Sequence, residues 1–112
     1  MNPRNQGKEN KEGNMKYEKE FRQMLDKWGE DSQIMMCIEE MAELQKELCK
    51  YLRIKANPDT VSAEKAQNLR QEIQAEIADV LNTVKQLALI FGYDEIYKIR
   101  DEKISKTMSK FF

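Results

Sequence analysis

The sequence predicts an all-α protein built as an antiparallel, four-helix bundle-like domain. Apolar residues recur at helical spacing over residues 34–52 and 69–91, and no stretch of strand length alternates between polar and apolar residues. The breaks between the helical segments are short, and short connections make consecutive helices antiparallel neighbours. We place this domain at residues 15–112, and we expect residues 1–14 to be a disordered tail because they offer almost nothing to bury.

The first two helices are expected to flank Gly29. The first covers Met15–Trp28, whose aromatic and aliphatic side chains share one face, and Gly29 ends it. Asp31 or Ser32 is the expected N-cap of the second helix, because short polar side chains accept hydrogen bonds from the first free amides of a helix. The periodic pattern of that helix runs from Ile34 to Lys55.

A turn and two further helices are expected to follow. Pro58 disfavours helix at the residue before it, so a turn is placed at residues 56–60. Ser62 is the expected N-cap of a long helix, and Gly92 is its expected C-terminal stop. Asp94 is then expected to cap a final helix that reaches the C-terminal phenylalanines.

Composition limits the classes of function. The net charge is −1, which gives no overall field for nucleic acid or for an acidic membrane surface. No apolar run approaches the roughly 20 residues of a membrane span, and we expect a cytoplasmic protein without a membrane partner. Aliphatic stripes occur on nearly every segment, so a lone thin bundle would expose apolar surface, and we expect self-association through these helix faces.

Two pairs of acids are the most informative feature of the sequence. Glu40 and Glu43 are three residues apart, as are Glu76 and Asp79. On a helix this spacing puts both side chains on one face. Each pair borders the apolar stripe of its helix, so packing the two stripes together is expected to bring four carboxylates to the seam. One such pair alone would more often belong to a solvent-exposed helix face. Two matching pairs, each beside an apolar stripe, favour a metal site.

The side chains available as metal ligands indicate a hard cation. The chain contains no histidine, which removes the ligands of carboxylate-bridged di-iron bundles and leaves zinc poorly served. Oxygen ligands alone suit Mg²⁺, with Mn²⁺ as a substitute. Because Mg²⁺ commonly shares its coordination sphere with substrate phosphates, the four acids indicate a phosphate-handling site, in which Glu40, Glu43, Glu76 and Asp79 are the expected metal ligands.

Hydrolysis by a metal-bound water is the simplest chemistry for such a site. Glu39 or Glu47 is expected to take the proton of the water or to act from outside the ligand set. Lys103 and Lys106, one turn apart near the C-terminus, are the expected phosphate-binding residues, although lysines there also suit the helix dipole. The candidates for binding a base are Trp28, Gln33 and Tyr51, with core packing the alternative for Trp28.

Residues 33–44 and 76–81 resemble the two signature helices of the MazG-like, all-α nucleoside triphosphate pyrophosphohydrolases, and the resemblance covers roughly Trp28 to Lys110. It implies hydrolysis of a (d)NTP to the monophosphate and pyrophosphate, with Mg²⁺ on the four acids. We expect catalytic roles for Glu39, Glu40 and Glu43. It also implies a homodimer or homotetramer with the substrate in a cleft between helices.

A second hypothesis is a non-enzymatic helical interaction or regulatory module. It is motivated by several methionines at helical positions, since methionine suits adaptable interfaces: Met24, Met35, Met36 and Met41. In that case the acids would only repel one another, and their removal would stabilise the fold whether or not Mg²⁺ is present.

Overall fold

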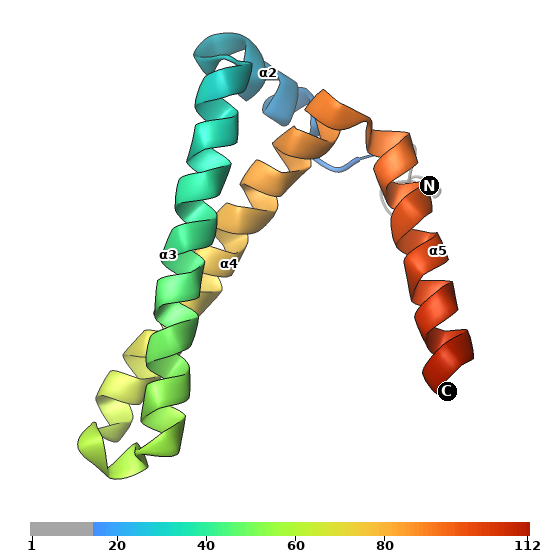
Figure 1. Cartoon of the computed structure of the whole chain (residues 1–112). Helices are drawn as coiled ribbons and strands as arrows, with labels where there is room; N and C mark the ends of the chain where they lie inside the picture. Colours follow the sequence, from blue (N-terminus) through green and yellow to red (C-terminus); the bar gives the residue numbers. More distant parts are fainter. Residues whose placement is uncertain (1–14) are drawn as a thin grey trace, which may run out of the picture.

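A computed structural model describes residues 15–112, and every regular element in that range is helical (Figure 1). The elements are α2 (Glu18–Trp28), α3 (Glu30–Ala56), a 3₁₀ turn η1 (Pro58–Thr60), α4 (Ala63–Phe91) and α5 (Tyr93–Phe111). The predicted all-α class is confirmed. The tail expected at residues 1–14 lies outside the described range. No helix between residues 15 and 112 is both long enough and apolar enough to cross a bilayer.

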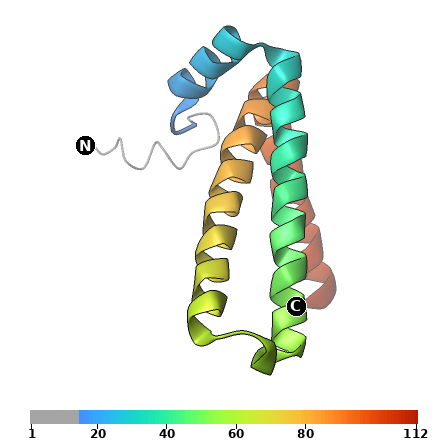
Figure 2. The same cartoon turned by 90° about the vertical axis from the view of Figure 1, so that its left-hand side faces the viewer.

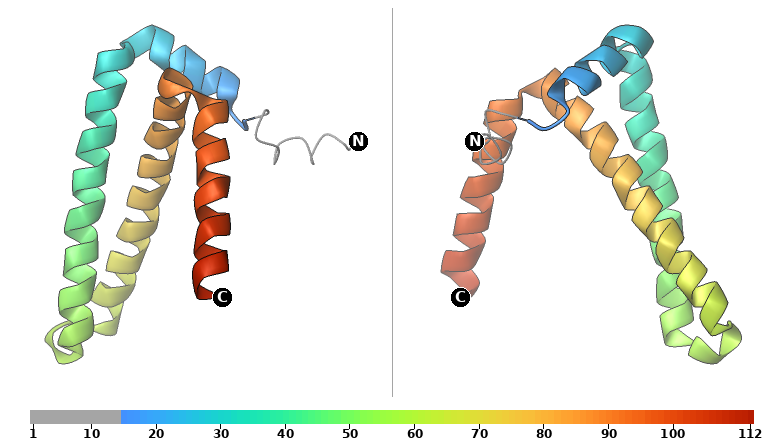
Figure 3. Two further views of the ribbon diagram at one scale, coloured as in Figure 1. Left: turned by 45° about the vertical axis from the view of Figure 1, so that its right-hand side comes forward. Right: turned by 180° about the vertical axis from the view of Figure 1, so that it is seen from behind.

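The fold is organised around the hairpin of α3 and α4, which run antiparallel side by side (Figure 2). Helix α2 crosses the end of this hairpin and contacts both of its helices. Helix α5 turns away from the end of α4, and beyond its first residue, Tyr93, it lies apart from α2 and α3 (Figure 3). Within one chain, the expected bundle-like arrangement is therefore limited to α2, α3 and α4, and one side of α5 stays open.

The seam of the hairpin follows a heptad-like pattern. Buried or half-buried residues recur at alternating spacings of four and three on both helices, as in a coiled coil. On α3 they are Gln33, Cys37, Glu40, Leu44, Glu47, Tyr51 and Ile54; on α4 they are Leu69, Ile73, Glu76, Val80, Thr83 and Leu87. The seam therefore contains carboxylates, amides and a hydroxyl between its aliphatic residues.

The expected packing of one apolar stripe against the other was wrong in part. On α3, Leu44 enters the seam, but Ile38 and Leu52 are 51% and 63% exposed. These two residues lie more than a third of a turn around the helix from the middle of the seam. On α4, Ile77 and Leu81 are displaced from the seam in the same rotational sense and are also exposed. The heptad spacing explains the difference, because it aligns Glu40 and Glu47 with Leu44 and leaves the other aliphatic residues outside.

The main apolar cluster lies where α2 meets the hairpin. Met15, Phe21 and Ala88 are buried there, with Met24, Leu89 and Tyr93 packed against them. Met15 precedes the first helix, which begins at Glu18 instead of at Met15 as expected. Tyr17 takes a left-handed conformation with φ of 65°, which turns the chain so that Met15 reaches this cluster.

Three of the expected helix ends are confirmed, and the first is Gly29, which ends α2. The Ser62 hydroxyl accepts a hydrogen bond from the Lys65 amide at 3.1 Å, which makes Ser62 the N-cap of α4. Gly92 ends α4 with φ of 116°, and its amide donates to the carbonyl of Ala88. Left-handed backbone of this kind is easily adopted only by glycine.

The expected caps Asp31, Ser32 and Asp94 were wrong. Each lies inside the first turn of its helix, and the N-cap positions belong to Gly29 and Gly92. One glycine thus joins each pair of helices, acting as the C-cap of one and the N-cap of the next. Asp31 and Asp94 still suit a first turn, because negative charge is favourable near the positive end of a helix dipole.

We predict that Gly29→Ala destabilises the fold by about 1–3 kcal/mol, because Gly29 has φ of 92° and ψ of 155°, a region that is nearly restricted to glycine. An added Cβ meets no atom within 4 Å, so backbone strain alone is responsible. Urea unfolding measures the change, and Ser32→Ala, at an exposed position on α3, is the control. An unchanged unfolding free energy for Gly29→Ala would show that the connection has another conformation.

Candidate metal centre

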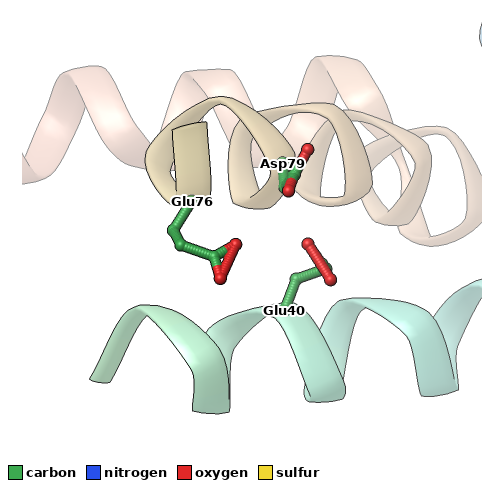
Figure 4. A group of neighbouring side chains, drawn as sticks. All are labelled: Glu40, Glu76 and Asp79. Atoms are coloured by element: carbon green, nitrogen blue, oxygen red, sulfur yellow. The ribbon is translucent and has the colours of Figure 1, made fainter. Parts of the chain in front are cut away.

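Three carboxylates converge halfway along the hairpin (Figure 4). Glu40 projects from α3, whereas Glu76 and Asp79 project from α4, and one oxygen of each lies within 4.8 Å of the others. Glu40 and Glu76 occupy seam positions, so the packing of the two helices holds both in this group. Asp79 is one turn beyond Glu76 and more exposed. The structure thus brings together three of the four acids expected to bind metal.

Glu43, the fourth expected ligand, is exposed and lies outside this close group. It is nevertheless near enough to raise the pKa of both Glu40 and Glu76 through its negative charge. Glu39 is exposed on α3 and also lies outside the group. Both side chains are exposed to solvent.

The cluster raises the pKa of two of its members. Partial burial raises the pKa of Glu40, followed by a hydrogen bond and charge repulsion from Asp79, with smaller repulsion from Glu76 and Glu43. Partial burial also raises the pKa of Glu76, and repulsion from Asp79 is the next cause. Both effects disfavour the ionised carboxylates. A cation among these oxygens would remove the repulsion.

Glu47 is a further acid in the seam, one turn beyond the Glu43 position toward the hairpin tip. It is only 7% exposed, and both of its carboxylate oxygens accept from the Lys50 ammonium at 3.3 Å. Its charge contributes to the raised pKa of Glu76. Glu47 is therefore close to the cluster but already neutralised by a cation, which suits a supporting role better than metal binding.

A pocket of about 350 Å³ adjoins Glu40 and Asp79. Its lining combines two of the acids with amide, hydroxyl and methionine side chains: Gln33, Met36, Glu40, Asp79, Asn82, Thr83 and Gln86. Gln33, an expected base-binding residue, is thus brought beside Glu40 and Asp79. This size is at the lower end for ligand pockets.

Gln86 is a pocket residue that the sequence reasoning missed. It is 2% exposed, and its Oε1 accepts a hydrogen bond from Gln33 Nε2 at 2.8 Å. The available signal was a glutamine inside the most apolar part of α4, between Val84 and Leu87. A polar side chain at such a position needs a buried partner.

The other expected contact residues lie elsewhere. Trp28 is 54% exposed at the end of α2, and Tyr51 lines a separate pocket near the hairpin tip. Neither lines the pocket beside the acids. Lys103 and Lys106 are exposed on α5, which contacts α4 only near the joint between the two helices. Within one chain these lysines are therefore not placed beside the carboxylates.

Comparison of the chain with protein-family models, curated proteins and solved structures finds no match. The resemblance to MazG-like enzymes thus stays a prediction from the two acidic motifs. The geometry is independent of it: oxygen donors converge from two helices, and they suit a hard divalent cation such as Mg²⁺ or Mn²⁺. With no histidine in the chain, softer metals have few ligands here.

We predict that metal-free protein gains stability from Glu40 and Glu76 as the pH falls from 7 toward 5. Their pKa is raised in the folded state, so the folded protein binds these protons more tightly than the unfolded chain does. This contribution is fully present below the ordinary carboxyl pKa and is lost as the pH rises through the raised values. Urea unfolding in EDTA measures it.

The control for this titration is Glu40→Gln, which mimics the protonated side chain. It should be more stable than the wild type at pH 7, and the difference should shrink at pH 5. Glu64→Gln, at an exposed position on α4, corrects for general charge effects. A difference between Glu40→Gln and the wild type that does not depend on pH would contradict the repulsion within the cluster.

Proposed function

We propose that this protein is a Mg²⁺-dependent nucleoside triphosphate pyrophosphohydrolase that converts a (d)NTP into the (d)NMP and pyrophosphate. The observation that carries the proposal is the convergence of Glu40, Glu76 and Asp79 from the two helices of the hairpin. Carboxylates of raised pKa beside a pocket are typical of functional sites. The two acidic motifs and their resemblance to MazG-like enzymes supply the reaction type.

In this proposal the four acids of the two motifs hold the metal. Glu40, Glu76 and Asp79 are already convergent, and Glu43 joins them by a change of rotamer. Bound Mg²⁺ would neutralise charge on the phosphoryl oxygens and lower the pKa of a coordinated water. The set also accepts Mn²⁺, because both are hard cations with oxygen ligands.

The hydrolysis is then proposed to proceed as follows at this site. The attacking water adds to the α-phosphorus, the bond from that phosphorus to the oxygen bridging to the β-phosphorus breaks, and pyrophosphate leaves with that oxygen. The water proton passes to Glu39, an exposed acid on α3 that is outside the proposed ligand set. Lys50 keeps Glu47 neutralised, which limits the negative charge that the triphosphate meets.

We also propose that the chain self-associates, as a homodimer or homotetramer, through an exposed apolar face of the hairpin. This face consists of Ile38, Met41, Leu48 and Leu52 of α3 with Ile77, Leu81 and Val84 of α4, all more than 40% exposed. Both groups are rotated from the seam in the same sense, and in antiparallel helices this puts them on the same side. Contiguous apolar surface of this extent is typical of an interface. A second copy could also bring Lys103 and Lys106 to the phosphates.

We predict that Asp79→Asn abolishes Mg²⁺-dependent pyrophosphate release and the rise in melting temperature that millimolar Mg²⁺ gives the wild type. A cation that binds only the folded state stabilises it by mass action. Turnover is measured on a panel of common and damaged (d)NTPs, with the products identified as mono- or diphosphates. Asp59→Asn, at an exposed acid in the hairpin turn, is the matched control. Undiminished release by Asp79→Asn would exclude the proposed site.

The exposed methionines and aliphatic residues also support the alternative of a non-enzymatic interaction module. In that case Asp79→Asn would stabilise the protein equally with and without Mg²⁺, and no nucleotide of the panel would be hydrolysed. The same melting experiment therefore separates the two functions.

We predict that Ile38→Glu combined with Leu81→Glu converts the assembled protein into a monomer, because a buried carboxylate in an apolar interface is strongly unfavourable. Light scattering coupled to size-exclusion chromatography gives the mass. Met35→Glu is the control, since Met35 is 54% exposed on α3 but lies outside this face. A wild-type monomer, or a double variant of unchanged mass, would rule out this interface.

A further inference from the structure

The pocket beside the acids contains a chain of amides whose direction is fixed by its surroundings. Gln86 Nε2 lies 3.4 Å from the carbonyl oxygen of Asn82 and 3.7 Å from the sulfur of Met24. Both of these atoms are acceptors, so the amino end of Gln86 must face them. Its oxygen therefore faces Gln33, and Gln33 must offer its own amino end, at 2.8 Å.

With the two amides oriented in this way, the Gln33 oxygen is the last group in the series of hydrogen bonds. Gln33 is 5% exposed and lines the pocket, yet its Oε1 has no hydrogen-bond partner among residues 15–112. A buried acceptor without a partner is unfavourable and unusual in a native protein. A ligand that donates a hydrogen bond at this point would satisfy it.

Thr83 also presents only a hydrogen-bond acceptor to the pocket. Its hydroxyl donates to backbone carbonyls of α4, at 3.0 Å to Val80 and 3.2 Å to Asp79. The single hydroxyl proton is thus engaged, and only lone pairs are left for the pocket. Glu40 and Asp79 also present oxygen atoms. Two hydrogen-bond donors in the pocket lining are not yet engaged. One is the Asn82 side-chain amide, and the other is the second N–H of Gln33 Nε2, the nitrogen that already donates to Gln86.

The position of Gln33 suits a nucleobase. It lies seven residues, about 10 Å of helix rise, before Glu40 on α3. This is comparable with the span from the far edge of a base to its 5′-phosphate. Met36, which lines the pocket between these residues and is partly exposed, offers a sulfur that packs well against an aromatic ring.

We infer that this pocket selects nucleotides whose base carries an exocyclic amino group, cytosine or adenine, over the corresponding keto bases, uracil or hypoxanthine. The amino group donates to Gln33 Oε1 on the acceptor-rich wall. A keto oxygen at the same point would face an acceptor and leave both oxygens unsatisfied. This inference rests on the proposed function, because it assumes that the phosphates of the same nucleotide lie at the acids.

The test uses pairs of nucleotides that differ only in this group. The kcat/KM for dCTP is compared with that for dUTP, and the value for ATP with that for ITP, in the presence of Mg²⁺. We expect the amino member of the preferred pair to be favoured by about tenfold to a hundredfold, the range that follows from one unsatisfied buried polar group. Equal values within both pairs, or a preference for dUTP or ITP, would overturn the inference while leaving the proposed reaction intact.

A binding measurement separates this inference from the proposed function. NMR titration with dCMP, dUMP, AMP and IMP needs no turnover, and the amino member should again bind more tightly. If no triphosphate is hydrolysed but dCMP or AMP binds selectively, the pocket is as inferred and the proposed reaction is wrong. If all four monophosphates bind equally or none binds, the inference is wrong.

The matched variants are Gln33→Leu and Gln45→Leu. Gln33→Leu removes the acceptor and should reduce the preference to about twofold or less, mainly by weakening the amino-bearing nucleotides. Gln45→Leu makes the same chemical change at an exposed position on α3 and should keep the preference. If Gln33→Leu retains the full preference, Gln33 is not the selecting residue. If Gln33→Leu fails to fold, the wild-type preferences for dCTP over dUTP and for ATP over ITP still test the inference.

Discussion

The antiparallel packing of α3 against α4 is the constraint on which the rest of this structure depends. Its heptad-like seam aligns Glu40 and Glu47 with Leu44 on one helix, and Glu76 with Ile73 and Val80 on the other. A seam that buries carboxylates gives up apolar burial and adds repulsion, both of which weaken the hairpin. Bound cations would offset this repulsion. This is the physical basis on which the proposed cation site rests.

The same register accounts for the unusual surface of the chain. Aliphatic residues that the seam does not use, among them Ile38, Leu52 and Leu81, are left exposed together on one side of the hairpin. The acids Glu43 and Asp79 extend toward the opposite side, because their rotation from the seam has the opposite sense. One hairpin thus separates an exposed apolar face from an edge that carries carboxylates. Assembly through the first need not cover the second.

Sequence reasoning was most reliable where the physical cause is local. The helix ends at Ser62 and Gly92 depend on hydrogen bonds and backbone angles within a few residues, and they were predicted correctly. The spacing of Glu76 and Asp79 likewise fixes their common face. The caps Asp31 and Asp94 failed because a single glycine connects each pair of helices, and that connection length follows from how the helices cross. Gln86 was missed because its partner, Gln33, is 53 positions away in the sequence.

The sequence by itself determined the all-α class, the long helices and the acids that are candidates for metal binding, since helical periodicity and oxygen donors can be identified from residue types and spacing. Only the tertiary structure decided which of two faces of α3 and α4 meet. That choice depends on side chains of both helices at once. It brought Glu40 together with Glu76 and Asp79, left the aliphatic face exposed, and joined Gln33 to Gln86 in a fixed direction. These contacts give the site its charge and its hydrogen-bonding character.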